Sequence, residues 1–384
     1  MTKNKQNVPQ VRFKGFTDDW EQRELDELVE FYSGLTYKPE DVTENGTLVL
    51  RSSNVKNSEI VLTDNVYVDE SVVNSDNVKK DDIIVVVRNG SKALIGKHAK
   101  IRHSMPNTVI GAFMTGVRSD SPDFINALLS TEMFDKEIKM NMGATINQIT
   151  GYMFANMEFM TPSFQERQAV GSFFSRLDNL ITLHQRKCET LQKLKKSMLQ
   201  KMFPKNGSHF PEIRFKGFTD AWEQRKLEEV ITVGNGMDYK HLSEGDIPVY
   251  GTGGYMLSVD KALSYDKDAI GIGRKGTIDK PYVLKAPFWT VDTLFYCIPK
   301  EDYSLDFVYC IFQNVNWKDK DESTGVPSLS KVNINSTDVK VPALAEQQQI
   351  GAYFRTLDTL ITLHQRKLET LKKLKKAMLQ KMFI

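Results

Sequence analysis

The sequence predicts an α+β fold in which two globular domains alternate with two long helices. Three observations lead to this prediction. The chain has 384 residues and is 40% hydrophobic, which is enough apolar material for two cored domains. The segment 173–203 recurs at 353–383 with only seven differences, and shorter segments recur between the helices in the same order. The chain is therefore expected to be an internal repeat of domain and helix.

The first domain is expected over residues 1–160 and begins with an aromatic segment. VRFKGFTDDWEQREL at 11–25 recurs as IRFKGFTDAWEQRKL at 213–227, with Phe13, Phe16 and Trp20 expected to bury apolar surface. Strands are expected at 47–50 and 83–87, and a helix at 124–142. Strands and helices do not alternate regularly, so a mixed α+β domain fits better than a doubly wound sheet.

The first long helix is predicted over residues 161–205. It follows Pro162, it places Glu166 in its first turn, where a helix favours an acid, and its repeated part lacks Gly and Pro. Apolar residues recur at alternating steps of four and three, which is typical of a coiled-coil seam. The seam residues are predicted to be Leu177, Ile181, His184, Cys188, Leu191, Leu194, Met198 and Met202.

The second domain is expected over residues 206–342 and repeats features of the first. Strands are expected at 247–250, 269–272 and 293–298, and a helix at 305–314. DDIIVVVRNGS at 81–91 aligns with KDAIGIGRKGT at 267–277, which pairs Arg88 with Arg274 at the end of a strand. Earlier in each domain, Gly34, Tyr37 and Lys38 align with Gly236, Tyr239 and Lys240.

The second long helix is predicted over residues 343–384, after Pro342 and with Glu346 in its first turn. Its seam residues are predicted to be Leu357, Ile361, His364, Leu368, Leu371 and Met378. A helix of ~40 residues is ~60 Å long. If the second helix packs along the first it must run back, so the pair is expected to be antiparallel with a pseudo-twofold axis. Duplex DNA, whose strands are antiparallel, suits such symmetry.

Composition excludes several classes. The three cysteines, Cys188, Cys297 and Cys310, form no CxxC pair and no disulfide framework, which favours a reducing cytoplasm. The N-terminus is polar, and the longest apolar run, 83–87, cannot span a membrane. The net charge of +2 hides an asymmetry. Residues 21–160 hold 14 Lys+Arg against 21 Asp+Glu and 221–340 hold 14 against 18, whereas 161–205 hold nine against three and 341–384 eight against three.

Basic loops inside the acidic domains are the candidate DNA-binding sites, because Lys can contact phosphates and Arg or Asn can contact base edges. The candidates are Tyr37, Lys38, Arg88, Asn89, Ser91, Lys92, Lys97, Lys100, Arg102, Tyr239, Lys240, Arg274, Lys275, Thr277 and Lys280. A solvated face that balances nearby acids is the alternative, and the tyrosines could be core aromatics. For Arg88 and Arg274 a scaffold role, with ion pairs to Asp82 and Asp268, competes with phosphate contact and with base reading.

Other motifs point to no catalytic or cofactor site. Gly271, Gly273 and Gly276 satisfy GxGxxG, but TIDKPYV follows where a helix should begin, so a strand-end turn is expected. Asp123, Glu137 and Lys139 loosely fit a PD…ExK nuclease pattern, with the last two in an expected helix. The sequence has no NPPY or DPPY tetrapeptide and no phosphate-binding GxxxxGK[ST] loop, and its six His show no metal-ligand spacing.

The order of repeated motifs resembles the specificity (S) subunit of type I restriction–modification systems, which defend bacteria. The carrying segments are PSFQERQAVGSFFSRLDNLI, PALAEQQQIGAYFRTLDTLI, FPEIRFKGFTDAWEQRKL and YGTGGYM…IGRKGTIDKPYV…WTVDTLFY. The resemblance implies a non-catalytic subunit whose two target-recognition domains each read half of a split double-stranded DNA site. It also implies that the helices are a spacer on which two methyltransferase subunits dock, joined by restriction subunits that act as motor and nuclease.

The resemblance implies no cofactor on this chain, with S-adenosylmethionine on the methyltransferase partner and ATP and Mg on the motor–nuclease partner. The helix lysines then have three possible uses: DNA phosphates, the methyltransferase, or a solvated flank. They are Lys193, Lys195, Lys196, Lys372, Lys373, Lys375 and Lys376. Two alternatives to the DNA-reading subunit are a coiled-coil scaffold whose domains bind protein or sugar, and a free-standing nuclease.

Overall fold

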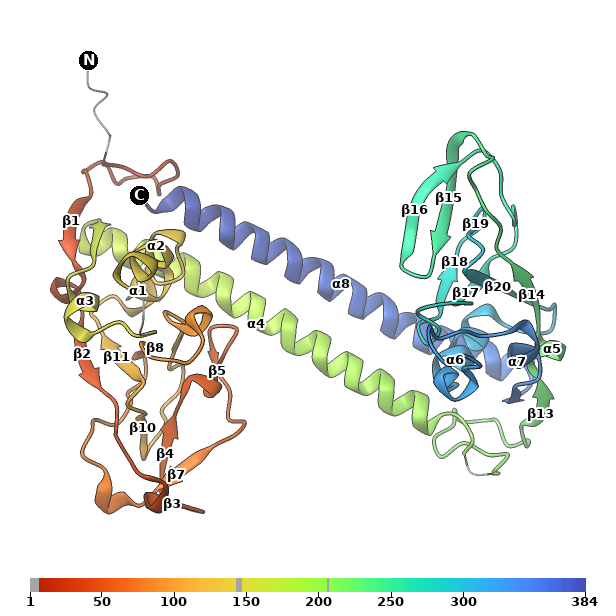
Figure 1. Cartoon of the computed structure of the whole chain (residues 1–384), viewed down its shortest axis with the longest axis horizontal. Coiled ribbons are helices and arrows are strands. Elements are labelled where there is room, and N and C mark those ends of the chain that lie inside the picture. The colour runs from red at the N-terminus through yellow and green to blue at the C-terminus, as the bar shows by residue number, and fades with distance from the viewer. Residues whose placement is uncertain (1–6, 143–146, 206) are drawn as a thin grey trace. The chain divides into compact units, whose positions relative to one another are not determined.

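The computed structural model describes residues 7–142, 147–205 and 207–384, and the chain divides into two compact units (Figure 1). The first unit contains residues up to His184 together with Lys367–Ile384, and the second contains Gln185–Arg366. The two long helices, α4 (Phe164–Lys201) and α8 (Leu344–Met382), each contribute one part to each unit. A compact unit is therefore a globular part together with one portion of both helices, and it does not coincide with a single predicted domain.

The globular part of the first unit is built from small mixed sheets with short helices. Two sheets have the strand orders β2-β11-β8-β9 and β10-β4-β7-β3, and the pairs β1–β12 and β5–β6 stand apart from them. The strands are β1 (Glu21–Glu24), β2 (Glu30–Ser33), β3 (Val42–Thr43), β4 (Thr47–Leu50), β5 (Val55–Lys56), β6 (Glu59–Ile60), β7 (Val66–Val68), β8 (Ile83–Val86), β9 (His98–Lys100), β10 (Thr108–Ile110), β11 (Met114–Arg118) and β12 (Glu158–Thr161). The helices before α4 are α1 (Pro122–Leu128), α2 (Glu132–Asn141) and α3 (Gly151–Ala155).

The globular part of the second unit follows the same plan with longer strands. Its sheets have the orders β14-β20-β17-β18 and β16-β15-β19, beside the pair β13–β21. The strands are β13 (Glu223–Lys226), β14 (Ile231–Asn235), β15 (Glu244–Gly251), β16 (Gly254–Val259), β17 (Ala269–Gly273), β18 (Tyr282–Leu284), β19 (Trp289–Thr290), β20 (Leu294–Pro299) and β21 (Asp338–Val341). The helices before α8 are α5 (Leu227–Val230), α6 (Leu305–Asn314) and α7 (Lys331–Asn335). The predicted α+β class is confirmed.

One predicted element differs from the structure. The expected helix over 124–142 is broken into α1, which ends at Leu128, and α2, which Thr131 caps by accepting a hydrogen bond from the backbone N–H of Phe134. A side-chain cap of this kind satisfies one of the first N–H groups of a helix, so a short break costs little. The predicted helix at 305–314 coincides with α6.

A buried ion pair anchors the start of each long helix. Glu166 in α4 accepts two hydrogen bonds of 2.7 Å from Arg12, and Glu346 in α8 accepts two of 2.7 Å from Arg214. Both carboxylates are only 1% exposed. The sequence-based explanation of these acids as partners of the helix dipole is therefore incomplete, since each one is the bidentate acceptor of an arginine from the repeated aromatic segment.

The far end of each long helix completes a core that begins with the repeated tryptophan. In the second unit the ring of Phe203 stacks on Phe307 at 5.6 Å and contacts Trp222 edge-on at 5.6 Å. In the first unit Phe383 takes the matching place, at 5.4 Å from Phe124 and 6.1 Å from Trp20. Aromatic pairs at these distances add to the apolar area that their burial removes from water.

Within each unit the two helices pack antiparallel. In the second unit Cys188 lies against Ile361, and further along α4, Lys195 pairs with Asp358, which is earlier in α8. In the first unit Lys375 pairs with Asp178 at 2.6 Å, as Lys195 does with Asp358 at 2.5 Å. All four of these charged side chains are at least partly covered, so the ion pairs belong to the contact between the helices.

These ion pairs correct the predicted seam. Leu194 was predicted to lie in it, but Leu194 is 37% exposed and Lys195 takes the position instead. A strict alternation of four and three continues from Leu191 to Lys195, and from Leu371 to Lys375. The greater hydrophobicity of leucine favours Leu194 as the seam residue, whereas the heptad spacing favours Lys195. The other predicted seam residues are buried or half-buried.

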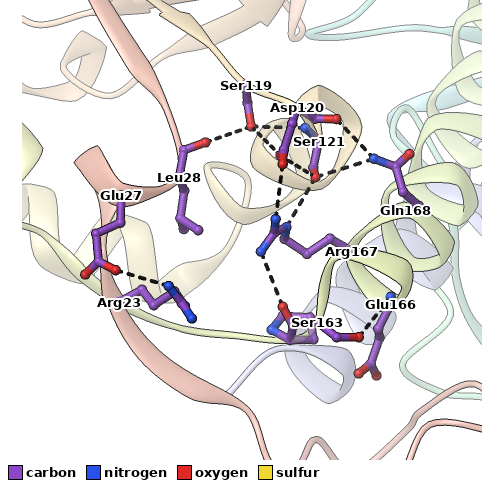
Figure 2. Close-up of polar contacts among 11 residues, drawn as sticks. Arg23, Glu27, Leu28, Ser119, Asp120, Ser121, Ser163, Glu166, Arg167 and Gln168 are labelled. Atoms are coloured by element: carbon purple, nitrogen blue, oxygen red, sulfur yellow. Dashed lines mark hydrogen bonds and ion pairs between the residues drawn. The ribbon is translucent and has the colours of Figure 1, made fainter.

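The N-terminal end of α4 is fixed to its domain by the polar contacts drawn in Figure 2. Arg167 bonds to Asp120 and to Ser121 Oγ, and Gln168 donates to the backbone carbonyl of Asp120. In α8 the position matching Arg167 is Gln347, which bonds to the backbone of Ser304 and Pro342. The two helices are thus attached in the same place by different side chains.

Candidate nucleic-acid interface

In the first unit the turn after β8 presents an exposed arginine. The guanidinium of Arg88 lies 5.0 Å from the ring centre of Phe113, which is itself 52% exposed. Asn89 donates to Ser52 Oγ at 3.0 Å and accepts from the backbone N–H of Ser91 at 3.0 Å, which fixes the turn. An arginine held on an aromatic face keeps most of its donors directed at solvent, where a phosphate or a base edge could accept them.

The matching turn in the second unit shows that the sequence alignment of Arg88 with Arg274 is wrong by one residue. Ile149 donates to the carbonyl of Val87, and Leu329, at the matching position, donates to that of Arg274. Arg88 and Lys275 each form the next bridge, to Gln148 and Ser328. The structural counterpart of Arg88 is therefore Lys275. Side chains alternate along extended backbone, so the shift by one residue turns Arg274 to the opposite face from Lys275. There the Arg274 guanidinium lies 5.9 Å from the ring centre of Phe295.

The proposed ion pairs of these arginines with Asp82 and Asp268 do not form. Asp82 accepts from Tyr32 Oη at 2.8 Å and from Arg118 at 3.2 Å, and burial together with the bond to Asp82 raises the pKa of Tyr32. Asp268 instead pairs with Lys285 at 2.5 Å. Arg88 and Arg274 are both exposed. The scaffold role for the two arginines is therefore excluded in the form in which the sequence suggested it.

Part of the predicted basic loop of the first unit is used to hold the loop in place. Lys100 pairs with Asp81 at 3.2 Å and also with Asp123 at the start of α1, and its side chain is only 13% exposed. Arg102 donates to Asn179 of α4 and lies 3.9 Å from Glu59. Both side chains are thus engaged in contacts within the fold, which makes them less available to a partner than the exposed candidates.

The remaining candidates divide by exposure. Burial, aided by nearby Lys56, lowers the pKa of Lys97, which is half-buried, as are Asn89, Tyr37, Tyr239 and Thr277. Tyr37 and Tyr239 pack against small apolar clusters, as the core-aromatic alternative predicted. The exposed candidates are Lys38, Arg88, Ser91, Lys92, Lys240, Arg274, Lys275 and Lys280.

One exposed element of the second unit was missed by the sequence reasoning. The hairpin β15–β16 carries Tyr255, which is 63% exposed, and Met256, which is 49% exposed. Its segment YGTGGYM is one of those that carry the family resemblance, but it contains no basic residue and therefore does not qualify as a basic loop. The signal that the sequence offers is an aromatic residue directly after a glycine-rich turn.

The catalytic patterns are not supported by the geometry. Gly273 ends β17 and is followed by a turn at Gly276 (φ +87°), as expected of a strand end. Asp123 of the PD…ExK pattern is paired with Lys100. Across the described residues, no group of His, Cys, Asp and Glu could hold a metal ion, and no helix of that same portion has the length and apolar character of a membrane span.

The two units share one core plan and present different exposed surfaces. The sequence matches the family described as type I restriction modification DNA specificity domain over residues 17–195 and 219–373. These ranges cover most of the chain, which therefore belongs to this family of DNA-recognising specificity subunits. The family implies no cofactor on the chain itself and supports the expected non-catalytic role.

Relatives and a solved structure agree with this assignment. The MjaVIII type I restriction enzyme specificity subunit of Methanocaldococcus jannaschii is 26% identical over 279 residues, 61% of this chain and 63% of the relative, so the match spans less than two thirds of that protein. The putative MjaX specificity subunit of the same organism is 23% identical over 420 residues, 97% of this chain and 94% of the relative. The S subunit of a type I restriction-modification system from M. genitalium shares the fold, with a TM-score of 0.74, 17% identity and coverage of 98% and 99% of the two chains.

Proposed function

We propose that this chain directs a type I restriction–modification complex to a bipartite duplex-DNA site, with each globular part reading one half. The observation that carries the proposal is the pairing of a repeated core with unlike surfaces. The anchoring pairs Arg12–Glu166 and Arg214–Glu346 have the same geometry, whereas the exposed turns and hairpins differ. A binding protein that must recognise two different half-sites needs such a division between shared support and variable contact.

The helices, in this proposal, set the spacing of the half-sites and hold two methyltransferase subunits. Each unit exposes the same pair of leucines on its helix. Leu180 and Leu183 are 43% and 60% exposed on α4, and Leu360 and Leu363 are 37% and 61% exposed on α8. Exposed apolar residues repeated at matched positions suit a partner that binds twice by the same face. S-adenosylmethionine would be bound by that partner, and ATP and Mg by the restriction subunits.

Exchange of residues 221–340 for the equivalent segment of another family member tests the reading of two half-sites. These residues begin just before β13 and end within β21, so the helices and their seam are unchanged. Methylome sequencing of cells that carry the chimera should show one half of the site altered and the other half and the spacing retained. A change in both halves at once would contradict independent reading.

Docking of the methyltransferase is tested by Leu183→Glu and Leu363→Glu. Each variant should reduce the number of methyltransferase subunits bound from two to one, and the double variant should bind none, as measured by native mass spectrometry. Leu62→Glu, at a residue of the first unit that is 57% exposed, is the matched control and should leave both sites occupied. Retention of two subunits by the double variant would contradict this docking face.

A further inference from the structure

The β15–β16 hairpin is the longest pair of strands among the described residues, and Figure 1 shows it at the end of the second unit remote from α6 and α7. Its strands cover Glu244–Gly251 and Gly254–Val259, and Gly251 pairs with Gly254 across the turn. At about 3.4 Å per residue the six residues of β16 extend about 20 Å. The equivalent pair in the first unit is β4–β7, since β4 also pairs in parallel with β10 as β15 does with β19, but its strands have only four and three residues.

The distal part of the hairpin carries no charge and little side-chain bulk at its turn. Residues 247–259 contain no Asp, Glu, Lys or Arg. Gly254 has φ +106°, and a Cβ built on Gly253 or Gly254 would meet no atom within 4 Å. Tyr255 and Met256 follow directly and are exposed. A turn of this composition lets the backbone approach a partner closely, and it offers no cationic side chain to a phosphate.

The exposed side chains at the tip are held from below by other aromatic residues. The ring of Tyr255 lies 6.4 Å from that of Tyr250, which lies 6.1 Å from that of Tyr282. Tyr282 Oη donates to the carbonyl of Gly251 at 2.6 Å, so the start of the turn is tied to β18. The tip is therefore preorganised, which reduces the entropy lost when it binds.

Charged residues of both signs lie at the other end of the hairpin. Lys240, His241 and Lys261 are exposed there beside the exposed acids Glu244, Asp246 and Asp260. The backbone N–H of Ser243 donates to Asp260 at 3.1 Å, which brings the two ends of the hairpin together. The charge of the hairpin is therefore confined to its base, and the tip brings no carboxylate toward a partner. An uncharged tip suits an element that enters a groove, because base edges form the groove floor and a carboxylate there would be repelled by the phosphates along the rims.

On the basis of the DNA-reading function proposed above, we propose that the β15–β16 hairpin enters the major groove and reads the half-site of the second unit through Tyr255 and Met256. The major groove is about 12 Å wide and admits a two-stranded ribbon, whereas the minor groove is about 6 Å wide and admits one only where the duplex is deformed. The Tyr255 hydroxyl lies 3.2 Å from Ser258 Oγ, and with Ser258 as the donor of that bond the tyrosine O–H can donate to the N7, O6 or O4 acceptors. Met256 provides apolar contact for a thymine methyl group.

Base analogues in the half-site assigned to the second unit test the proposal on the full chain bound to its methyltransferase subunits. Uracil in place of thymine removes the major-groove methyl, 7-deazaguanine removes N7, and inosine in place of guanine removes only the minor-groove amine. For the wild type, the first two substitutions should weaken binding about 5- to 100-fold, and inosine should have no effect. The analogues are placed at each thymine and guanine of that half-site in turn.

The variant Tyr255→Ala/Met256→Ala should bind the specific duplex about 10- to 100-fold more weakly and lose its sensitivity to the major-groove analogues. Its affinity for a scrambled duplex and the slope of affinity against salt should be unchanged, because no phosphate contact is removed. Phe210→Ala, at an exposed aromatic residue of the same unit outside the hairpin, should behave as wild type. Thermal melting shows that each variant is folded.

The possible outcomes distinguish a failure of the hairpin proposal from a failure of the DNA-reading function on which that proposal rests. If the double variant discriminates bases as the wild type does, or if only inosine weakens wild-type binding, the major-groove hairpin is wrong and the DNA-reading function stands. If the wild-type complex prefers no duplex over a scrambled one, the proposed function itself is wrong.

Discussion

The two units use the same internal supports and present different surfaces. Both bury a tryptophan against the phenylalanine that lies just after the end of a long helix, and both pair an arginine with a buried glutamate. At the surface the first unit offers Arg88 over the ring of Phe113, and the second offers the hairpin of Tyr255, whose tip carries no charge. The residues that the two units share are those that join the globular part to the long helices. The contacts at this junction are therefore more alike between the units than the exposed surfaces are.

A buried tyrosine shows how far the cores can diverge while the shape is kept. In the first unit a side chain on Gly116 of β11 would collide with the ring of Tyr32 of β2, at 1.9 Å. In the second unit the tyrosine is Tyr296 of β20 and the glycine is Gly234 of β14, with a matching distance of 2.1 Å. In both units the tyrosine ring packs on a glycine of the neighbouring strand, but the strands that carry the tyrosine and the glycine are exchanged. Packing volume is therefore the shared requirement, and the strand that supplies it is free to change.

The largest expected effect is on the contact between the helices. Leu371 is 6% exposed, so Leu371→Asp would bury an unpaired carboxylate and reduce the free energy of unfolding by at least about 4 kcal/mol. Binding to the split DNA site should be lost although neither reading surface is changed.

Leu374→Asp, one turn further on at a residue that is 38% exposed, is the control and should stay folded and bind DNA. Denaturant unfolding and a DNA-binding titration measure both; wild-type affinity in a folded L371D protein would show that the seam does not set the spacing.

A smaller effect is expected at the helix ends, where the two units can be compared directly. Phe383→Ala and Phe203→Ala should each lower the free energy of unfolding by about 3–5 kcal/mol, because each removes an aromatic ring from a closed core. Hydrogen exchange should show the loss of protection in the first unit for F383A and in the second unit for F203A. The opposite assignment, or a uniform loss in both, would contradict the division of the helices between the units.

The smallest effects concern the exposed turns. Arg88→Ala and Lys275→Ala are structural counterparts, so both should weaken binding to specific and scrambled duplexes alike and reduce the salt slope by about one unit. Neither should change the melting temperature. Arg274→Ala, at the position before Lys275, should not reproduce the reduced salt slope of K275A. If R274A reproduces R88A and K275A does not, the counterpart of Arg88 in binding is the residue that the sequence alignment suggested. A loss of ~1–3 kcal/mol at one base position would instead assign base reading.

Much of the fold could be predicted because the strongest signals are local and repeated. The heptad spacing predicted both long helices, and alternating apolar residues predicted strands such as β4 and β17. The contacts of Glu166 with Arg12 could not be predicted, because partners 154 residues apart leave no local pattern. The one-residue shift at Arg88 was also hidden, since the similarity of RNGS and RKGT favours a gapless alignment, whereas backbone hydrogen bonds decide the register.

The candidate site was predicted less completely. Basic residues were easy to find, but charge alone does not distinguish Lys100, which holds its loop to α1, from Arg88, which faces solvent. That distinction depends on acids brought close by the fold. The hairpin of Tyr255 was missed because its tip contains no charged residue. Aromatic residues are expected in cores as often as on surfaces, so their exposure became visible only with the neighbouring strands in place.

Because Phe383 and the rest of 367–384 belong to the first unit, that unit cannot close its core until the last residues of the chain are made. Domains usually fold as the ribosome releases them, the N-terminal one first. Here the ribosome makes all of 185–366 before the helix segment that closes the core around Trp20. The first unit, most of which is made first, must therefore wait for the end of synthesis to cover the apolar surface that Phe383 contacts.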